Sequence, residues 1–235
     1  MKILVACEKS QAVTIELRRL GHEAYSCDII ECSGGHPEWH IQQSVSPLLN
    51  GRCSFKTSDG VEHTIAGRWD MIIAHPPCTY LTNGGAVRVF RQEFREYPPY
   101  GKFQMVNVER LKQGMIGRDF FMAIMYAQCD KIAIENPIPM SIYMLPSCQQ
   151  IIQPYEYGDP YSKKTCLWLK GLPNLQPTNI LQEYQPFING GGGRMNRPNY
   201  KGKKFAGGSS KRSKTFPGVA RAMAEQWAGK ISEEC

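Results

Sequence analysis

A cysteine follows two prolines in the segment His75-Pro76-Pro77-Cys78, directly after an apolar run at 69–74. The run predicts a buried strand, which must stop here because neither proline has an amide hydrogen to donate. Cys78 is therefore expected on a stiff loop at a strand end, where open α/β sheets bind ligands. Such a thiol could act as a nucleophile, although taken alone an inert buried cysteine explains it more simply.

A second polar corner, Glu135-Asn136-Pro137, ends the apolar run at 131–134. If both runs are parallel strands of one sheet, Cys78 and Glu135 lie at the same edge. A buried carboxylate without a partner costs stability, so a function is one reason to keep it there. Together the two residues predict covalent catalysis at a carbon centre, with Cys78 as nucleophile and Glu135 binding and polarising the substrate.

The elements that must position these corners alternate between strands and helices. We expect strands at 3–7, 23–28, 71–74, 131–135, 150–155 and 165–169, and helices at 11–20 (capped by Ser10), 114–129 and 216–230. Residues 52–66 alternate around Asp59-Gly60, which predicts an inserted β-hairpin, and the stretch up to about Tyr100 is expected to be irregular. This order predicts one α/β domain over 1–235 with a doubly wound, mostly parallel sheet.

The positive charge is concentrated in a Gly-rich loop expected over 174–214, while the rest of the chain is close to neutral. No acid interrupts its eight cations, which are Arg194, Arg197, Lys201, Lys203, Lys204, Lys211, Arg212 and Lys214. One interpretation is a solvated, disordered loop. The other is a basic arm for phosphates, since Tyr200 and Phe205 lie among the cations and could stack on bases.

Composition limits the classes of protein to consider. At 235 residues and 42% hydrophobic, the chain can bury one substantial core. No apolar run approaches the roughly 20 residues needed to span a bilayer, and the charged start of the chain does not resemble a secretory signal. Nine scattered cysteines then favour reduced thiols over a disulfide framework. We therefore expect a cytoplasmic protein without a membrane partner.

In this order, the motifs resemble those of the C5-cytosine DNA methyltransferase family. That family carries Pro-Cys at the end of one strand and Glu-Asn-Val at the end of the next, here Pro77-Cys78 and Glu135-Asn136-Pro137. The segment 157–165 looks like the family's Tyr-Gly-Val-Pro-Gln-x-Arg-x-Arg, and 214–224 looks like its terminal helix. The chain is similar, more narrowly, to small methylase-like proteins common in bacteriophage genomes.

The resemblance implies a sheet of the S-adenosylmethionine-dependent methyltransferase type, with a late antiparallel strand pair and the basic loop as a minimal target-recognition region. It implies a reaction on cytosine in DNA, in which Cys78 adds to C6 and Glu135 contacts the N3 and amino edge. Lys163 stands where the family has its first arginine. The substrate-binding residues implied by the motifs are Pro76, Pro77, Asn136 and Pro137.

The implied cofactor is S-adenosyl-L-methionine, held at the ends of the first strands. The positions that correspond to the family's cofactor contacts are Cys7, Glu8, Ser10, Gln11, Asp28, Ile29, Ser44 and His75. Asp28 ends the second strand, where an acid usually binds ribose hydroxyls. The loop after the first strand departs from the family because it has no glycine, but the helix N-terminus behind Ser10 could receive a carboxylate.

Four alternatives stay open. The same chemistry could act on a free pyrimidine nucleotide, or the chain could be a non-catalytic nucleic-acid or nucleotide-binding protein on this scaffold. The chain could also be an amino-methyltransferase, although it shares only the two prolines of the His75 corner with those enzymes. Cys32, His36 and His40 have a spacing that could hold zinc, but without a paired Cys-x-x-Cys. We expect no metal, and a polar loop with Trp39 packed on the body instead.

Overall fold

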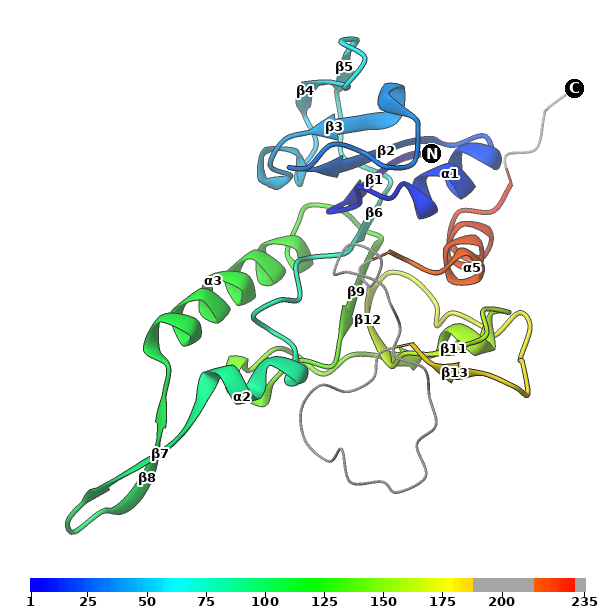
Figure 1. The fold of residues 1–235 in the computed structure, drawn as a ribbon. Coiled ribbons are helices and arrows are strands. Elements are labelled where there is room, and N and C mark those ends of the chain that lie inside the picture. Colours follow the sequence, from blue (N-terminus) through cyan, green and yellow to red (C-terminus); the bar gives the residue numbers. More distant parts are fainter. Residues whose placement is uncertain (188–213, 231–235) are drawn as a thin grey trace, which may run out of the picture.

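A seven-stranded sheet forms the centre of the computed structural model, which describes residues 1–187 and 214–230 (Figure 1). In spatial order, its strands are β10 (Gln150–Ile152), β12 (Thr165–Lys170), β9 (Ile132–Pro137), β6 (Met71–Ala74), β1 (Lys2–Ala6), β2 (Glu23–Asp28) and β3 (His40–Gln42). The central strands β1, β2, β6 and β9 consist largely of buried apolar residues, as expected for strands covered on both faces.

The sheet is mostly parallel, because only β12 runs against its neighbours. It pairs antiparallel with β9 on one side and with β10 on the other, whereas the remaining neighbours pair in parallel. The strand order reverses between β1 and β6. This arrangement confirms the predicted doubly wound sheet with a late antiparallel pair, and it creates the crevice at which such sheets bind ligands.

Helices cover both faces of the sheet. Helices α1 (Ala12–Arg19) and α5 (Pro217–Trp227) pack side by side on one face, over Ile3 and Val5 of β1. Helix α3 (Val108–Met125) covers the other face, where its Phe121 and Ile124 join the core that contains Leu4 and Ala6. Figure 1 shows α1 and α5 on one side of the strands and α3 on the other.

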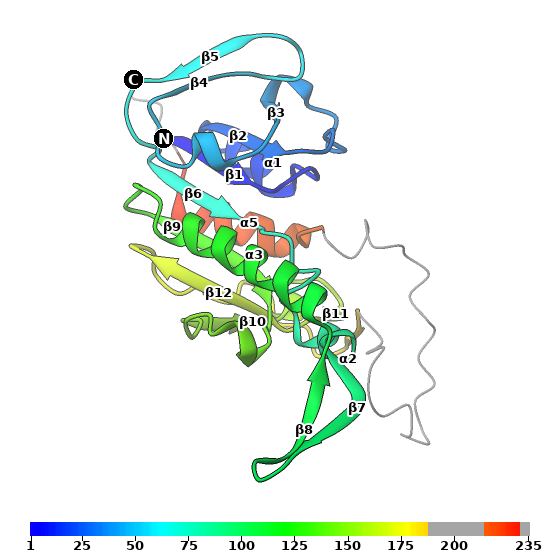
Figure 2. The ribbon, with the colours of Figure 1, turned by 90° about the vertical axis from the view of Figure 1, so that its left-hand side faces the viewer.

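Two hairpins leave the sheet. The first consists of β4 (Cys53–Lys56) and β5 (Glu62–Ile65), within the range where the sequence predicts a hairpin. The second follows the short helix α2 (Ala86–Val89) and consists of β7 (Phe90–Tyr97) and β8 (Gly101–Val106). It projects from the body in both views (Figures 1 and 2). The expectation of an irregular stretch here was therefore wrong.

Three further local expectations were wrong. Helix α3 begins at Val108, well before the expected start at 114, because the Asn107 side chain accepts a hydrogen bond from the Arg110 amide at 3.1 Å and caps the helix. Strand β3 was not expected. The residue that precedes α1 is Gln11, which has a left-handed backbone and no capping side-chain bond, so the predicted Ser10 cap is not formed.

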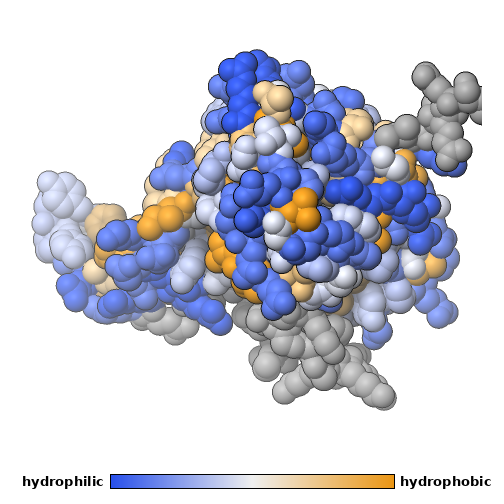
Figure 3. All heavy atoms as spheres, turned by 90° about the horizontal axis from the view of Figure 1, so that it is seen from above, coloured by the Kyte–Doolittle hydropathy of each residue, from blue (hydrophilic) through white to orange (hydrophobic). Residues whose placement is uncertain are grey.

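The remaining elements are short. Strands β11 (Tyr161–Ser162) and β13 (Gln185–Pro186) pair in parallel. The single turns of 3-10 helix are η1 (Pro37–Trp39), η2 (Ser46–Leu48), η3 (Asn83–Gly85), η4 (Ser141–Tyr143) and η5 (Pro154–Glu156). Within residues 1–187 and 214–230, no helix is long and apolar enough to cross a membrane. Viewed from above, the surface is mostly hydrophilic, with hydrophobic atoms in small separate patches (Figure 3).

Candidate active site

The Cys78 corner is built from the end of β6. The last backbone bond of the strand runs from the His75 amide to the Ala6 carbonyl at 2.9 Å, and the two prolines that follow have no amide hydrogen. The Cys78 carbonyl accepts hydrogen bonds from the amides of Leu81 and Thr82, both at 3.1 Å. Cys78 therefore begins a tight turn, and its side chain is half-buried.

A side chain of α3 holds the loop after Cys78. The Arg110 guanidinium donates a hydrogen bond to the Thr79 carbonyl at 2.9 Å and lies over the Tyr80 ring at 4.7 Å. From the sequence, Arg110 was not connected with Cys78, since its helix was expected to start later. Arg110 lies in the first turn of α3, which begins at Val108.

Asn136 ties the second corner to the first. Its side chain is 2% exposed, and its amide nitrogen donates to the Pro76 carbonyl at 3.3 Å. The neighbouring strand register pairs Ala74 with Ile134, so the residues that follow each of them lie side by side at the edge. The structure thus brings the two predicted corners together, as parallel neighbouring strands require.

The register places His75 against Glu135. Nδ1 of His75 lies 3.3 Å from a carboxylate oxygen of Glu135, and the two side chains are 8% and 16% exposed. Burial lowers the pKa of His75, but its bond to Glu135 and its attraction to Glu135 and Glu8 outweigh burial, so this pKa lies above its ordinary value.

Glu135 shows the complementary shift. Burial would raise the pKa of its carboxyl, but the hydrogen bond from His75 and the positive charges of Lys163 and His75 outweigh burial, with help from the Thr165 hydroxyl. The pKa of Glu135 therefore lies below its ordinary value. The 3.3 Å contact and both shifts show that the imidazolium form of His75 and the carboxylate form of Glu135 stabilise each other.

Lys163 and the start of α5 complete the walls around Glu135. A small pocket is lined by residues of β9, the end of β10, η5, the turn before β12, the first residue of β12 and the start of α5. These residues are Glu135, Ile152, Pro154, Lys163, Thr165, Lys214, Thr215, Phe216 and Val219. The Lys163 ammonium lies 5.8 Å from the centre of the Phe216 ring. Two cations beside a carboxylate suit a polar ligand that carries negative charge.

The segment at 157–165 and the terminal helix meet directly. The Gly218 amide in the first turn of α5 donates to the Asp159 carboxylate at 3.0 Å. A Cβ on Gly218 would lie 2.0 Å from the Tyr157 carbonyl oxygen, so only glycine permits this approach. Burial raises the pKa of Asp159 despite that hydrogen bond. The two segments that carry the late part of the resemblance therefore form one structural unit beside Glu135.

Glu8 occupies the N-terminus of α1. Its carboxylate accepts hydrogen bonds from the Val13 amide at 2.7 Å, the Thr14 amide at 3.3 Å and the Thr14 hydroxyl at 2.7 Å. The side chain is buried, and burial raises its pKa above the ordinary value despite the attraction of His75 and these bonds. The helix N-terminus does receive a carboxylate, but it is one from the chain itself.

Other residues of the loop after β1 also make contacts within the protein. The Gln11 side chain is fully buried and bonds to the Ser26 hydroxyl and to both the carbonyl and the amide of His36. Cys7 has a left-handed backbone with φ of 59°, and burial together with Asp28 raises the pKa of its thiol. Ser10 is half-buried.

The end of β2 offers a better-exposed group of predicted cofactor residues. Asp28 is half-buried, and one of its carboxylate oxygens accepts the Ile30 amide at 3.1 Å. The adjacent Ile29 and Ile30 are 72% and 52% exposed, which is unusual for large apolar side chains at a sheet edge. Ser44 is exposed, and its hydroxyl accepts the Ser46 amide at 3.4 Å. A carboxylate beside apolar side chains suits a nucleoside.

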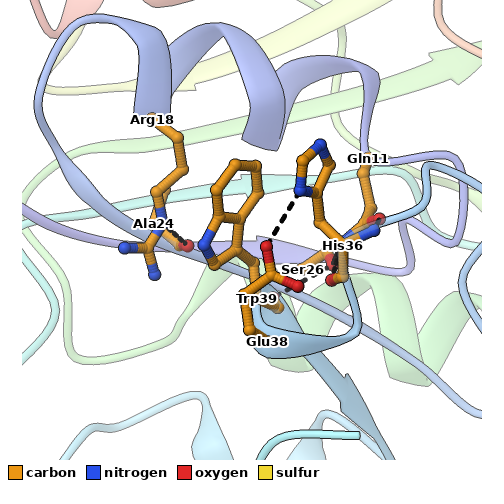
Figure 4. A network of polar contacts seen from close by, with 7 residues as sticks. All are labelled: Gln11, Arg18, Ala24, Ser26, His36, Glu38 and Trp39. Atoms are coloured by element: carbon orange, nitrogen blue, oxygen red, sulfur yellow. Dashed lines mark hydrogen bonds and ion pairs between the residues drawn. The ribbon is translucent and has the colours of Figure 1, made fainter. Parts of the chain in front are cut away.

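The zinc alternative is not supported in the described part of the chain, where no three His, Cys, Asp or Glu residues come together in a way that could hold a metal ion. His36 pairs with Glu38 at 2.9 Å, and its ring stacks on Trp39 at 3.8 Å. Figure 4 shows Trp39 between His36 and Arg18. Both ring nitrogens of His40 bond within the protein, to the Ser26 hydroxyl and the Ile30 carbonyl.

Most of the predicted nucleic-acid contacts lie outside the described residues. These are Arg194, Arg197, Lys201, Lys203, Lys204, Lys211 and Arg212. Lys214 is described; it is exposed and borders the Glu135 pocket. Of the eight predicted contacts, the structure therefore describes only Lys214, and it lies at the candidate site.

Comparisons with known proteins add little to this description. No family model and no curated protein matches the sequence. Among solved structures, the chain is similar to one from E. coli described as a "putative DNA modification methyltransferase encoded within prophage", with 13% identity and a TM-score of 0.41. The match covers 76% of this chain and 51% of the other, so this chain spans about half of that length. Function must therefore be argued from the site itself.

Proposed function

We propose that this protein transfers a methyl group from S-adenosylmethionine to carbon 5 of cytosine in DNA, through a covalent bond between Cys78 and carbon 6. The observation that carries this proposal is the joining of the two corners, by the hydrogen bond from Asn136 to Pro76 and the pairing of His75 with Glu135. These contacts support the proposal because they join the loop that carries the Cys78 thiol to the corner that carries the Glu135 carboxylate. The mostly parallel sheet with β12 reversed is compatible with the methyltransferase type that the resemblance implies.

The chain supplies a nucleophile and a group that binds the pyrimidine edge. Cys78, as the thiolate, adds to C6 of a cytosine that has left the base stack. The electron pair of the C5–C6 double bond then moves toward C5, while Glu135 contacts N3 and the amino group. S-adenosylmethionine, when bound, supplies the methyl group as an electrophile. After methylation, C5 loses its proton and Cys78 leaves C6, which restores the ring.

The residues at the end of β2 fit the nucleoside part of this cofactor. Asp28 would hold ribose hydroxyls, and the exposed Ile29 would cover the base. The carboxylate of the cofactor would need donors other than the first amides of α1, because Glu8 already uses them. The proposal therefore assigns cofactor binding to the β2 side of the crevice.

Methyl transfer tests the proposal. Purified protein is incubated with labelled S-adenosylmethionine and a duplex pool of randomised sequence that contains cytosine. We expect label in the DNA with the wild type and none with Cys78→Ser. Cys53→Ser is the matched control, because Cys53 is also half-buried but lies in β4. Undiminished transfer by Cys78→Ser, or none by the wild type, would refute the proposal.

A second candidate is a nucleic-acid-binding protein on the same scaffold without catalysis. The bonds from the first amides of α1 to Glu8 favour it, since they remove one anion site that a cofactor could use. Calorimetric titration with S-adenosylmethionine and S-adenosylhomocysteine separates the two candidates. Binding that Asp28→Ala abolishes supports the enzyme, whereas no binding of either compound supports the scaffold.

A further inference from the structure

His75 lies buried among two carboxylates that come from neighbouring strand ends. Glu135 at the end of β9 is 3.3 Å from Nδ1, and Glu8 after β1 attracts the ring electrostatically. The other ring nitrogen, Nε2, is buried and has no hydrogen-bond partner in the part of the chain that the structure describes. Glu8, His75 and Glu135 thus lie at the ends of three neighbouring strands, β1, β6 and β9, and the strand order reverses between β1 and β6.

The backbone fixes the ring in this place. The His75 amide is bonded to Ala6, and the register of β6 with β9 sets His75 beside Glu135. The other groups that face the ring are the Lys163 ammonium, whose charge opposes protonation, and the Thr215 hydroxyl, 3.5 Å from Nδ1. Two carboxylates against one lysine leave an environment that favours the imidazolium.

Burying an imidazolium here costs stability, so a functional reason for keeping it is to be sought. Removing two charges from water is costly, and a well-packed apolar pair of the same size is often as stable. The pocket beside Glu135 is the place where the proposed substrate would bind, and perturbed titratable groups gather at such sites. His75 touches Glu135 and is nearly inaccessible to solvent, so it would act through Glu135.

We propose that His75 is a positioning residue that orients Glu135 and supplies, through Glu135, the proton that N3 of the pyrimidine receives when Cys78 adds to C6. This inference rests on the proposed function. It assigns His75 to proton transfer, whereas the sequence predicts it among the cofactor contacts.

The proton count closes over one cycle. As the Cys78 sulfur bonds to C6, negative charge moves into the C5–C4–N3 system. The Nδ1 proton of His75 passes to the Glu135 carboxylate, and the carboxylic acid formed there gives the proton to N3. After the transfer Glu135 is ionised again and His75 is neutral. When the C5 proton passes to a solvent water and the bond from Cys78 to C6 breaks, the sulfur leaves as the thiolate and N3 returns its proton through Glu135 to His75.

The first test measures the ion pair without any reaction. The ring resonances of labelled histidine are followed against pH, with His75 assigned from His75→Asn. We expect the wild-type ring to titrate above 6.5, the ordinary value, and to fall to or below it in Glu135→Gln. A His75 titration that Glu135→Gln leaves unchanged would overturn the proposal.

The second test follows the first chemical step. A duplex pool carrying 5-fluorocytosine traps the adduct, because C5 then has no proton to lose. With S-adenosylmethionine present, the wild-type rate of adduct formation should be bell-shaped in pH, with an alkaline limb set by His75. His75→Asn should be slower by about 100-fold and lack that limb. His75→Gln is the second variant if the first does not fold.

His22→Asn is the matched control, because His22 is also buried but lies in the turn before β2 and bonds to the Gly229 carbonyl. It should keep the wild-type pH profile. If the wild type forms the adduct and His75→Asn keeps the same alkaline limb, the proposed role of His75 is refuted and the proposed function is not. If the wild type forms no adduct at any pH, the proposed function is refuted, and so is the proton transfer from His75 through Glu135.

Discussion

The pairing of His75 with Glu135 makes the stability of the fold depend on pH. The pKa of His75 is raised, so its contribution is present below about 6.5 and is lost as pH rises through the folded-state pKa. The pKa of Glu135 is lowered, so its contribution is present above 4.5 and is lost as pH falls through the folded-state pKa. The pair therefore stabilises most between these two values.

Urea unfolding of the wild type and His75→Asn measures this contribution. We expect the wild type to be more stable by about 1.5–3 kcal/mol at pH 5.5, the range for hydrogen bonds to charged groups. The difference should shrink at pH 9. A difference that is the same at both pH values would show that the ring is neutral in the folded protein.

At the residue scale, the sequence indicated the corners but not the partners within them. Cys78, Glu135 and Asn136 stand out because polar side chains follow apolar runs. The partner of Glu135 depends on the register between β6 and β9, which pairs Ala74 with Ile134. That register cannot be predicted from one amino-acid sequence. Glu8 was similarly predicted to face a cofactor. Its carboxylate instead accepts the Val13 amide five residues later in the chain, after a left-handed backbone at Cys7 that the sequence did not indicate.

At the scale of single elements, helix α1 depends on Glu8 for its N-terminal bonds. Glu8→Ala removes the acceptor of two amides and one hydroxyl in a buried place, so we expect it to destabilise the fold by about 2–4 kcal/mol. Ser10→Ala is the control and should cost less than about 0.5 kcal/mol, because Gln11 and not Ser10 precedes the helix. Equal losses in urea unfolding would contradict this assignment.

The elements that the sequence predicted well are those with a buried face. Strands β2 and β6 have the expected bounds, since both are short apolar runs between turn residues. The hairpin of β7 and β8 was missed because much of it is exposed on both faces, with Phe94 and Phe103 about half-exposed, and so it lacks a clear alternation. The start of α3 could have been found from Asn107, a typical N-cap residue.

At the scale of the whole molecule, the net charge of +7 resides in the basic segment at 194–214. If most of these cations contact phosphates, the affinity for DNA should fall by roughly 10³ to 10⁵ between 50 and 200 mM salt. Replacing the seven cations of 194–212 by glutamine should flatten that dependence. A free nucleotide as substrate predicts a shallow dependence in both proteins.

The control for this measurement removes cations elsewhere. Arg68 and Lys131 lie with Asp70 and Asp130 near the start of β6 and β9, at the edge opposite the candidate site. Arg68→Gln combined with Lys131→Gln should leave the salt dependence as it is in the wild type. If this control flattens it as much as the loop variant does, the basic segment is not the main contact with DNA.

The overall topology was predictable because alternating strands and helices admit few arrangements. The mostly parallel sheet and the reversal beside β1 fit that expectation, whereas the antiparallel β12 was expected only from the resemblance. The contact between residues 157–159 and the start of α5 was not predicted. It depends on Gly218, whose missing side chain lets the helix approach the Tyr157 carbonyl.

The central claim is that Cys78 forms a covalent bond to cytosine at this edge of the sheet. The most direct test is the intact mass of the protein after incubation with 5-fluorocytosine DNA and S-adenosylmethionine, for the wild type and Cys78→Ala. We predict a wild-type species heavier by one DNA strand plus a methyl group, and no such species with Cys78→Ala. A wild type without the adduct, or the same adduct on Cys78→Ala, would contradict the claim.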